Sequence, residues 1–173
     1  GINLRDNDRL IEVRLTDGSH DVVLSTKYGL GIRFAEKEIS PVGRVSIGVI
    51  GIRFKKKEDE VVGCEIFHED EKEKSLFTAT SRGFGKRTML YRYRKQHRGG
   101  KGIIDIQTGG RNGYVVGVKA VKPGDEIILI TKAGVVIRMN AEDIRAVGRN
   151  TQGVKLINLS PGDTIMDMAL VST

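Results

Sequence analysis

The sequence predicts an all-β protein in which one structural unit occurs about three times. The main observation is a repeat, because four sets of glycines or arginines recur along the 173 residues with the same two separations, 54 and then 51 residues. Short β-branched runs bounded by turn residues occupy matching places in each unit, which is typical of strands. The composition, 22 glycines against 3 prolines, favours tight turns over a disordered linker.

The repeat can be read directly from the residue numbers. Its four sets are Gly29, Gly83 and Gly134; Arg33, Arg87 and Arg138; Arg44, Arg98 and Arg149; and Gly48, Gly102 and Gly153. The same spacing in four independent sets indicates a true repeat and not a coincidence of composition. The first set is expected to consist of turn glycines.

The elements of the first unit follow from local patterns. Two strands are expected at residues 10–15 and 21–26, joined by a hairpin signal. A turn and a third strand follow over 27–34, then one helical turn over 35–40 and extended sequence over 41–52. Because the later units repeat this order, the same elements are expected in each of them.

The predicted architecture is a propeller-like assembly, since a period near fifty residues with about four strands per unit is typical of propellers or solenoids. The predicted units are about three four-stranded blades, residues 1–52, 53–106 and 107–157, and the closing strand of a further blade within 158–173. Closed rings of this kind contain about four to eight blades. Either upstream blades lie outside this chain, or two copies associate to complete a ring.

Charge points to a polyanionic partner. The formal net charge is +7, but residues 1–74 hold 13 basic and 15 acidic side chains, whereas residues 75–173 hold 16 basic and 7 acidic ones. The most basic stretch, residues 86–102, has no carboxylate and seven cations: Lys86, Arg87, Arg92, Arg94, Lys95, Arg98 and Lys101. Its glycine-rich end is expected to expose backbone amides, so the stretch suits a phosphodiester backbone. A solvated basic hairpin is the alternative.

Other classes of function find little support. Cys64 is the only cysteine, lies in an apolar run and is expected in the core, which excludes an internal disulfide and suggests a reducing compartment. No apolar run is long enough to span a bilayer and no signal peptide opens the chain, so a soluble protein is expected. A phosphate-loop pattern is absent, and His20, His68 and His97 are scattered, so neither catalytic nor metal-binding residues are expected.

Several segments carry a resemblance to a known family: GFGKRT (83–88), QHRGGKGIIDI (96–106), NGYVVGVKAV (112–121) and AVGRNTQGVKLI (146–157). Over essentially all its residues the chain resembles the C-terminal domain of gyrase A, the DNA-cleaving component of a bacterial type IIA topoisomerase. The resemblance implies a six-bladed β-pinwheel, in which a strand passes to the neighbouring blade. The chain resembles the C-terminal half of that domain.

One loop resembles the gyrase A box of this family, Q-x-R-G-G-K/R-G, in which His97 stands where Lys or Arg is common. In the family the box needed for wrapping lies in the first blade, so the loop here is either that determinant or a secondary contact. Taken with the strand arginines and the 86–102 stretch, the candidate DNA contacts are Gln96, Arg98, Gly99, Gly100, Lys101, Gly102, Arg44, Arg149, Lys86, Arg87, Arg92, Arg94, Lys95, Arg33 and Arg138.

The resemblance implies a function in DNA topology. The chain is expected to bind, bend and wrap double-stranded DNA without sequence specificity, and so to support ATP-dependent negative supercoiling by the whole enzyme. Expected partners are the rest of gyrase A and gyrase B, in an assembly with two copies of each. No cofactor is expected for this chain, since ATP and Mg²⁺ are used elsewhere in that enzyme. The expected location is the cytoplasm, with the nucleoid.

Two alternatives stay open. One is the C-terminal domain of topoisomerase IV, which has the same blades with eroded boxes, although the intact run Gly99-Gly100-Lys101-Gly102 favours gyrase. The other is a protein-interaction propeller whose basic face meets an acidic partner. Steep salt dependence of DNA binding would favour the DNA-binding readings.

Overall fold

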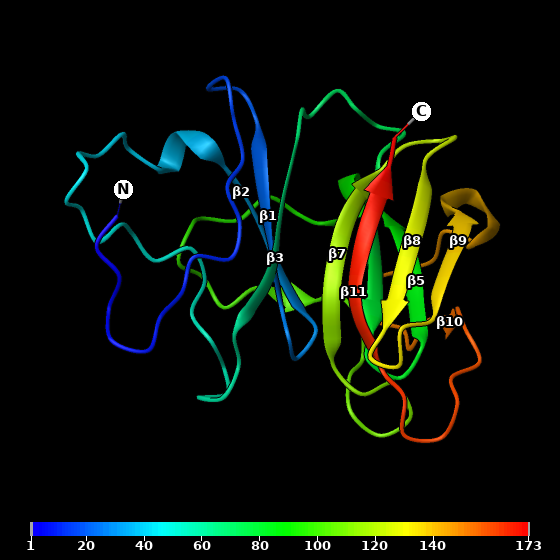
Figure 1. Ribbon diagram of the computed structural model, residues 1–173. Coiled ribbons are helices and arrows are strands. Elements are labelled where there is room, and N and C mark those ends of the chain that lie inside the picture. Colours follow the sequence, from blue (N-terminus) through cyan, green and yellow to red (C-terminus); the bar gives the residue numbers. More distant parts are fainter. Residues whose placement is uncertain (1, 173) are drawn as a thin grey trace.

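The computed structural model describes residues 2–172, and it confirms the all-β fold. Its eleven strands form three antiparallel sheets that stand side by side (Figure 1). The first sheet has the order β3-β1-β2-β6, the second β10-β5-β4-β7 and the third β11-β8-β9. No helix in the described part of the chain is long and apolar enough to cross a membrane.

Each sheet is built on a hairpin from one repeat. The hairpins are β1 (Asp21–Thr26) with β2 (Leu30–Ala35), β4 (Ser75–Thr80) with β5 (Phe84–Met89), and β8 (Glu126–Thr131) with β9 (Val136–Asn140). A short 3-10 turn follows each hairpin, as expected for residues 35–40: η1 (Glu36–Glu38), η2 (Leu90–Arg92) and η3 (Ala141–Asp143). Glycine is required at the hairpin turns, where Gly29, Gly83 and Gly134 have φ of +82°, +83° and +85°.

In each sheet, one edge strand comes from the next repeat. We call it the inner strand, because it packs against the corresponding strand of a neighbouring sheet. The pairs are β3 (Val61–Phe67) with β1, β7 (Val115–Val121) with β4, and β11 (Ile165–Val171) with β8. The second and third repeats also add short outer strands, β6 (Ile103–Ile104) on β2 and β10 (Val154–Lys155) on β5. The sheets therefore combine strands from two repeats. The last strand, β11, completes the third sheet. The predicted division of the chain into four units stays a prediction about the sequence, with bounds at residues 1–52, 53–106, 107–157 and 158–173.

Two expectations for the first repeat are wrong. Residues 10–15 form no strand, and Leu15 is 91% exposed; residues 41–52 likewise contain no strand. In the later repeats, residues 10–15 correspond to β3 and β7, and residues 41–52 correspond to the segments that contain β6 and β10. Each of these four strands pairs with the hairpin of the preceding repeat. No such hairpin precedes residue 10 among the described residues, so the backbone groups of both segments lack a ladder partner.

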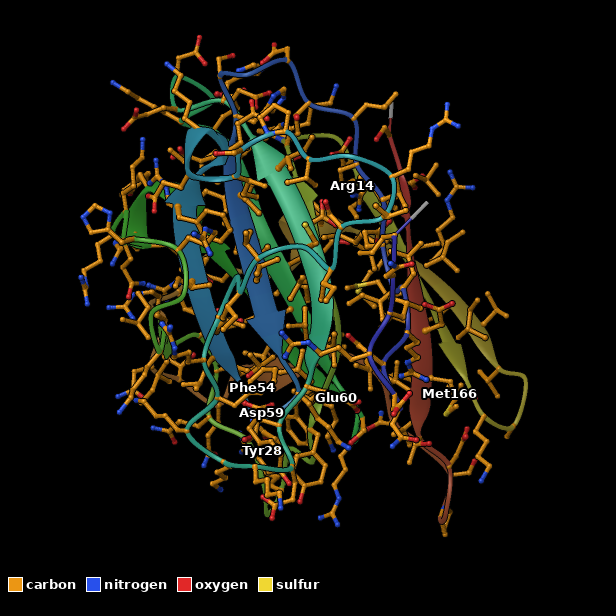
Figure 2. The ribbon with its side chains drawn as sticks, turned by 90° about the vertical axis from the view of Figure 1, so that its left-hand side faces the viewer. Arg14, Tyr28, Phe54, Asp59, Glu60 and Met166 are labelled. Atoms are coloured by element: carbon orange, nitrogen blue, oxygen red, sulfur yellow. The ribbon has the colours of Figure 1, made fainter. Side chains whose placement is uncertain are left out.

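The segment around residue 14 nevertheless lies along β3. Figure 2 labels Arg14 on this segment. Its side chain donates a hydrogen bond from Nη2 to Glu65 Oε1 at 2.7 Å and one from Nε to the Cys64 carbonyl at 3.3 Å. Cys64 itself is half-buried on β3, and burial raises the pKa of its thiol to about 11. This fits a packing role for the cysteine, because the thiolate is the reactive form.

The hydrophobic core is divided among the sheets. One cluster includes Val23, Phe67, Leu76 and Val118 and joins the first two sheets, a second includes Phe77, Leu129 and Ile165, and a third includes Ile32 and Phe34. Because β3 packs on β7 and β7 on β11, the inner strands lie side by side. The outer strands β6 and β10, with the loops that lead to them, lie at the opposite edge of their sheets.

Candidate nucleic-acid interface

The basic stretch 86–102 does not form one exposed hairpin. It starts inside β5, passes through η2 and then runs along the edge of β2 towards β6, where Lys95 makes an isolated parallel bridge with Arg33. In the third repeat Ala146 makes the equivalent bridge with Arg87, one repeat later. The loops that carry the predicted DNA contacts therefore lie along the outer edges of successive sheets.

Lys86 points into the protein. Its side chain is 1% exposed, its Nζ lies 2.9 Å from Asp105 Oδ1 and donates to Thr88 Oγ1 at 2.6 Å. Burial lowers the pKa of this ammonium group, against the opposing effect of Asp105. Asp105 also accepts hydrogen bonds from Tyr93 Oη and from Thr78 Oγ1. This burial removes Lys86 from the candidate DNA contacts.

The arginines at 33, 87 and 138 all contact other groups of the protein. Arg33 is buried and donates to Asp21 Oδ2 at 2.8 Å and to the Tyr93 carbonyl at 3.1 Å. Arg87 donates to the Ile144 carbonyl at 3.0 Å, which is the same contact one repeat later. Arg138 is exposed and forms an ion pair with Glu126. Arg33 and Arg87 thus link one repeat to the next. Because Arg33 is buried, the prediction that it contacts DNA is wrong.

The loop arginines repeat a second structural contact. Arg98 donates to the carbonyls of Glu38, at 3.1 Å, and Ile50, at 2.7 Å. Arg149 donates to the carbonyls of Arg92, at 3.1 Å, and of Ile104, at 2.9 Å, and these acceptors each stand 54 residues further along the chain. Both guanidinium groups therefore fix the loop to the preceding 3-10 turn, while both side chains stay half-exposed. Arg44, by contrast, is exposed.

The glycine-rich loop packs closely on the backbone beside it. The amide of Gly99 donates to the Gly51 carbonyl at 2.7 Å and that of Gly100 to His97 at 3.3 Å, so the expectation that these amides face a phosphate is wrong. Gly102 has φ of +70°, and a Cβ there would lie 2.8 Å from the Gly31 carbonyl oxygen. The backbone N–H of Gln96 donates to the Arg33 carbonyl at 2.7 Å. The box-like sequence is thus first a packing motif.

Four exposed cations on the loops at the outer edges of the sheets are not used in these structural contacts. We call this set the basic edge: Arg92, Arg94, Lys101 and Arg145. Within the described residues their side chains make no hydrogen bond or ion pair. Lys95 is exposed as well but lies 3.1 Å from both Asp21 and Glu69. Arg145 was not among the sequence candidates, although it stands 51 residues after Arg94, the separation seen in the repeat. The basic edge is therefore the part of this region whose cationic side chains are exposed and unpaired among the described residues.

Strand-exchanged antiparallel sheets in tandem define a repeat domain of the β-propeller type. The family model described as DNA gyrase C-terminal domain, beta-propeller, matches residues 20–68, 74–122 and 125–172. Each matched range runs from the first strand of a hairpin to the strand donated by the next repeat. The chain belongs to this family.

Curated relatives support this membership. The chain is 42% identical over 164 residues to the gyrase A protein of Haloquadratum walsbyi, a match that covers 95% of this chain and 19% of the relative. It is 43% identical over 171 residues to the gyrase A protein of Kosmotoga olearia, covering 98% of this chain and 21% of the relative. The chain therefore spans about a fifth of the length of these curated relatives.

Solved structures share the fold. The crystal structure of the C-terminal domain of DNA topoisomerase IV matches with a TM-score of 0.91 and 28% identity, over 99% of this chain and 52% of that one. The structure of the DNA gyrase A C-terminal domain matches with a TM-score of 0.86 over 98% of this chain and 56% of that one, and at 24% identity this likeness shows the fold alone.

Proposed function

We propose that this chain binds double-stranded DNA without sequence specificity and bends it along the outer edges of successive sheets. The observation that carries the proposal is the basic edge, Arg92, Arg94, Lys101 and Arg145, in a member of the gyrase C-terminal family. These side chains are exposed and have no carboxylate partner among the described residues, so a phosphate would not have to displace one. The other candidates stay secondary: Arg87, Lys95, Arg98, Arg149, Arg138, Arg44, and the loop residues Gln96, Gly99, Gly100 and Gly102.

Placement along successive edges supports bending. Arg94 and Arg145 occupy the same position one repeat apart, so a duplex that follows both must follow the curvature of the sheets. Smooth bending of a 20–30 bp site costs about 1–6 kcal/mol, which phosphate contacts must offset. Such contacts carry little sequence information and weaken steeply with salt.

In the whole protein this chain would act as a wrapping module. We propose that it works with the rest of gyrase A and with gyrase B, in an assembly with two copies of each that uses ATP and Mg²⁺ elsewhere to introduce negative supercoils. The chain itself would supply no catalytic residue and no cofactor site for that reaction. It would act in the cytoplasm, on nucleoid DNA, and self-association is one way to complete its ring.

Binding across a salt series tests the proposal. Duplexes of increasing length, labelled for bend-sensitive fluorescence, are titrated with the chain and with the variant Arg92→Ala/Arg94→Ala/Lys101→Ala. The slope of log K against log salt is expected to become shallower by about 0.9 for each lost phosphate contact, and the length-dependent bending is expected to weaken. The matched control, Arg5→Ala/Arg9→Ala/Lys132→Ala, removes the same charge from exposed sites outside this edge and is expected to bind like the parent.

Equal losses in both triple variants would mean that net charge and not the basic edge attracts DNA. A flat salt response would favour the protein-interaction propeller. A second candidate function is that of the corresponding domain of topoisomerase IV, which the structural match favours. Binding with a weak bend, unaffected by Arg98→Ala/Lys101→Ala, would support that candidate.

A further inference from the structure

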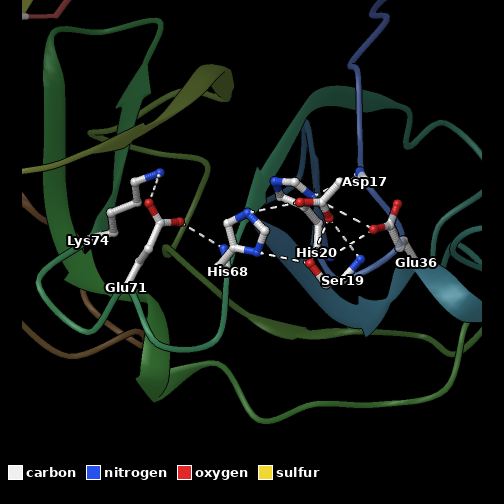
Figure 3. Close-up of polar contacts among 7 residues, drawn as sticks. All are labelled: Asp17, Ser19, His20, Glu36, His68, Glu71 and Lys74. Atoms are coloured by element: carbon white, nitrogen blue, oxygen red, sulfur yellow. Dashed lines mark hydrogen bonds and ion pairs between the residues drawn. The ribbon is translucent and has the colours of Figure 1, made fainter.

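A cluster of side chains outside the basic edge gathers at the start of the first sheet. Two of the three histidines of the chain, His20 and His68, lie there with their ring centroids 3.8 Å apart (Figure 3). Asp17, in the loop before β1, is the third member, and ligand atoms of the three residues all lie within 4.8 Å of one another. Sequence spacing does not indicate a metal site here, because 48 residues separate the histidines.

The strand register explains why the histidines meet. In the β1–β3 ladder Asp21 lies opposite Phe67, so the next pair in the same register is His20 and His68. In the β1–β2 ladder Asp21 lies opposite Ala35, so the same step places Glu36 beside His20 on its other side. Directly opposed residues in such ladders have Cβ atoms about 4.5–5.5 Å apart. Three strand ends thus present Glu36, His20 and His68 in one row, and the 16–19 loop brings Asp17 to it.

The distances suit one small cation. Asp17 Oδ1 lies 3.0 Å and Glu36 Oε1 lies 3.7 Å from His20 Nδ1, and Asp17 Oδ2 lies 3.5 Å from His68 Nε2. Tetrahedral zinc with bonds of about 2.0–2.2 Å holds its ligand atoms about 3.3–3.6 Å apart. Small side-chain shifts would therefore bring two imidazoles and a carboxylate onto one ion. The Asp17 amide, which contacts His20 Nδ1 at 3.4 Å, would give up that weak hydrogen bond.

Neighbouring groups already orient these ligands. Ser19 Oγ donates to Asp17 Oδ1 at 2.6 Å and lies 3.2 Å from His68 Nδ1. With the proton on Nδ1 directed to Ser19, the lone pair of His68 Nε2 faces Asp17, which is how ligating histidines are commonly fixed. Hydrogen bonds from the Ser19 hydroxyl and amide lower the pKa of Asp17 to about 2, so this carboxyl is ionised at neutral pH. The His20 amide donates to Glu36 Oε1 at 2.7 Å, and the His68 amide to Glu71 Oε2 at 2.8 Å.

We propose that Asp17, His20 and His68 form a zinc-binding site, with Glu36 or a water molecule as the fourth ligand. Two imidazoles with one or two carboxylates suit Zn²⁺ better than Mg²⁺ or Ca²⁺, which prefer oxygen ligands alone. Because His20 belongs to the first repeat and His68 to the strand donated by the second, the ion would fasten that exchanged strand to its acceptor hairpin. Its role would be structural and independent of the proposed DNA contacts.

Zinc titration of the untagged, chelator-treated chain tests this proposal. Calorimetry at pH 7.5 is expected to show one equivalent bound, and thermal unfolding is expected to shift to higher temperature with Zn²⁺ but not with Mg²⁺. Ser19→Ala, which removes a group that orients the ligands, is expected to weaken zinc binding by roughly 10–100-fold. His20→Gln and His68→Gln each remove a ligand and are expected to weaken it more. Affinity should also fall as the pH is lowered, because protons compete with zinc for its ligands.

His97 provides the matched control. It is the third histidine, its side chain is 99% exposed, and it lies near Glu38 alone among the acidic residues described, so His97→Gln should bind zinc like the parent. The milder variant Ser19→Ala keeps all three ligands and covers the case in which a histidine variant fails to fold. Zinc binding that survives in His20→Gln/His68→Gln, or is lost equally in His97→Gln, would overturn the proposal, as would the absence of zinc binding by the parent chain.

Discussion

At the scale of single residues, the middle repeat differs from its neighbours in one respect that burial makes costly. Its interior holds five polar side chains at positions where the first and third repeats have apolar residues or glycine: Thr78, Lys86, Thr88, Tyr93 and Asp105. Lys86 stands where those repeats have Ile32 and Ile137. The network is satisfied internally, since Asp105 accepts from Lys86, Tyr93 and Thr78. Because its members come from β4, β5, the residue after η2 and the chain after β6, it ties both ends of the basic loop to the second sheet.

Removing one member of this buried pair is expected to be costly. Lys86→Ile leaves the Asp105 carboxylate buried without its cation and should lower the free energy of unfolding by about 3–5 kcal/mol. Lys86→Ile/Asp105→Leu copies the apolar pair of the third repeat, Ile137 and Leu156, and should recover most of that loss. Urea unfolding of parent, single and double variants measures both values. A single variant as stable as the parent would show that the pair does not stabilise the fold.

Much of the fold followed from residue spacing, but the roles of the repeated arginines did not. A position that keeps its residue in every repeat satisfies a constraint common to all of them, and in this fold that constraint is the joining of repeats: Arg98 and Arg149 contact equivalent carbonyls. Exposed cations are freer to vary, so Arg94 and Arg145 have Ser40 as their counterpart in the first repeat. Spacing also could not reveal the Asp17 cluster, because it depends on a strand ladder between different repeats.

At the scale of secondary-structure elements, alternating charges connect the inner strands. Glu65 on β3 lies between Arg14, 2.7 Å away, and Lys119 on β7, 3.8 Å away, and these three residues occupy one position in successive repeats. The Glu65 side chain is largely buried. Burial raises the pKa of its carboxyl, more than the neighbouring cations lower it. In the folded protein the Glu65 carboxyl is therefore protonated more readily than the carboxyl of an exposed glutamate.

A pH dependence of stability follows from that shift. The folded state binds the Glu65 proton more tightly than the unfolded state, so its contribution is fully present below the ordinary pKa of 4.5 and is lost as pH rises through the folded-state value. Glu65→Gln stays neutral throughout. The free energy of unfolding of the parent minus that of Glu65→Gln should therefore fall as pH rises from 4 towards 7, as measured by urea unfolding at each pH. A difference that rises over this range would show that the ion pairs outweigh burial.

At the scale of the whole molecule, stability is expected to be graded along the repeats, because each sheet contacts only its neighbours. The second sheet has the first and third on either side through β3–β7 and β7–β11 packing, and every residue of β4 is buried. The third sheet lacks an outer fourth strand among the described residues, and three of the five residues of β9 are exposed. Residues 10–15 and 41–52 have no strand pairing. The stability of each region should follow the number of its packed neighbours.

Native-state hydrogen exchange measures this gradient amide by amide. Amides of β4 and β7 should exchange slowest, at a rate set by global unfolding, whereas those of β9 should exchange faster and those of residues 10–15 and 41–52 fastest. Lys86→Ile should speed exchange throughout β4 and β5 but change residues 10–15 little, because opening there does not require the second sheet to unfold. Uniform exchange across all three sheets would instead mean that they unfold as one cooperative unit, and that contact between neighbours makes the repeats interdependent.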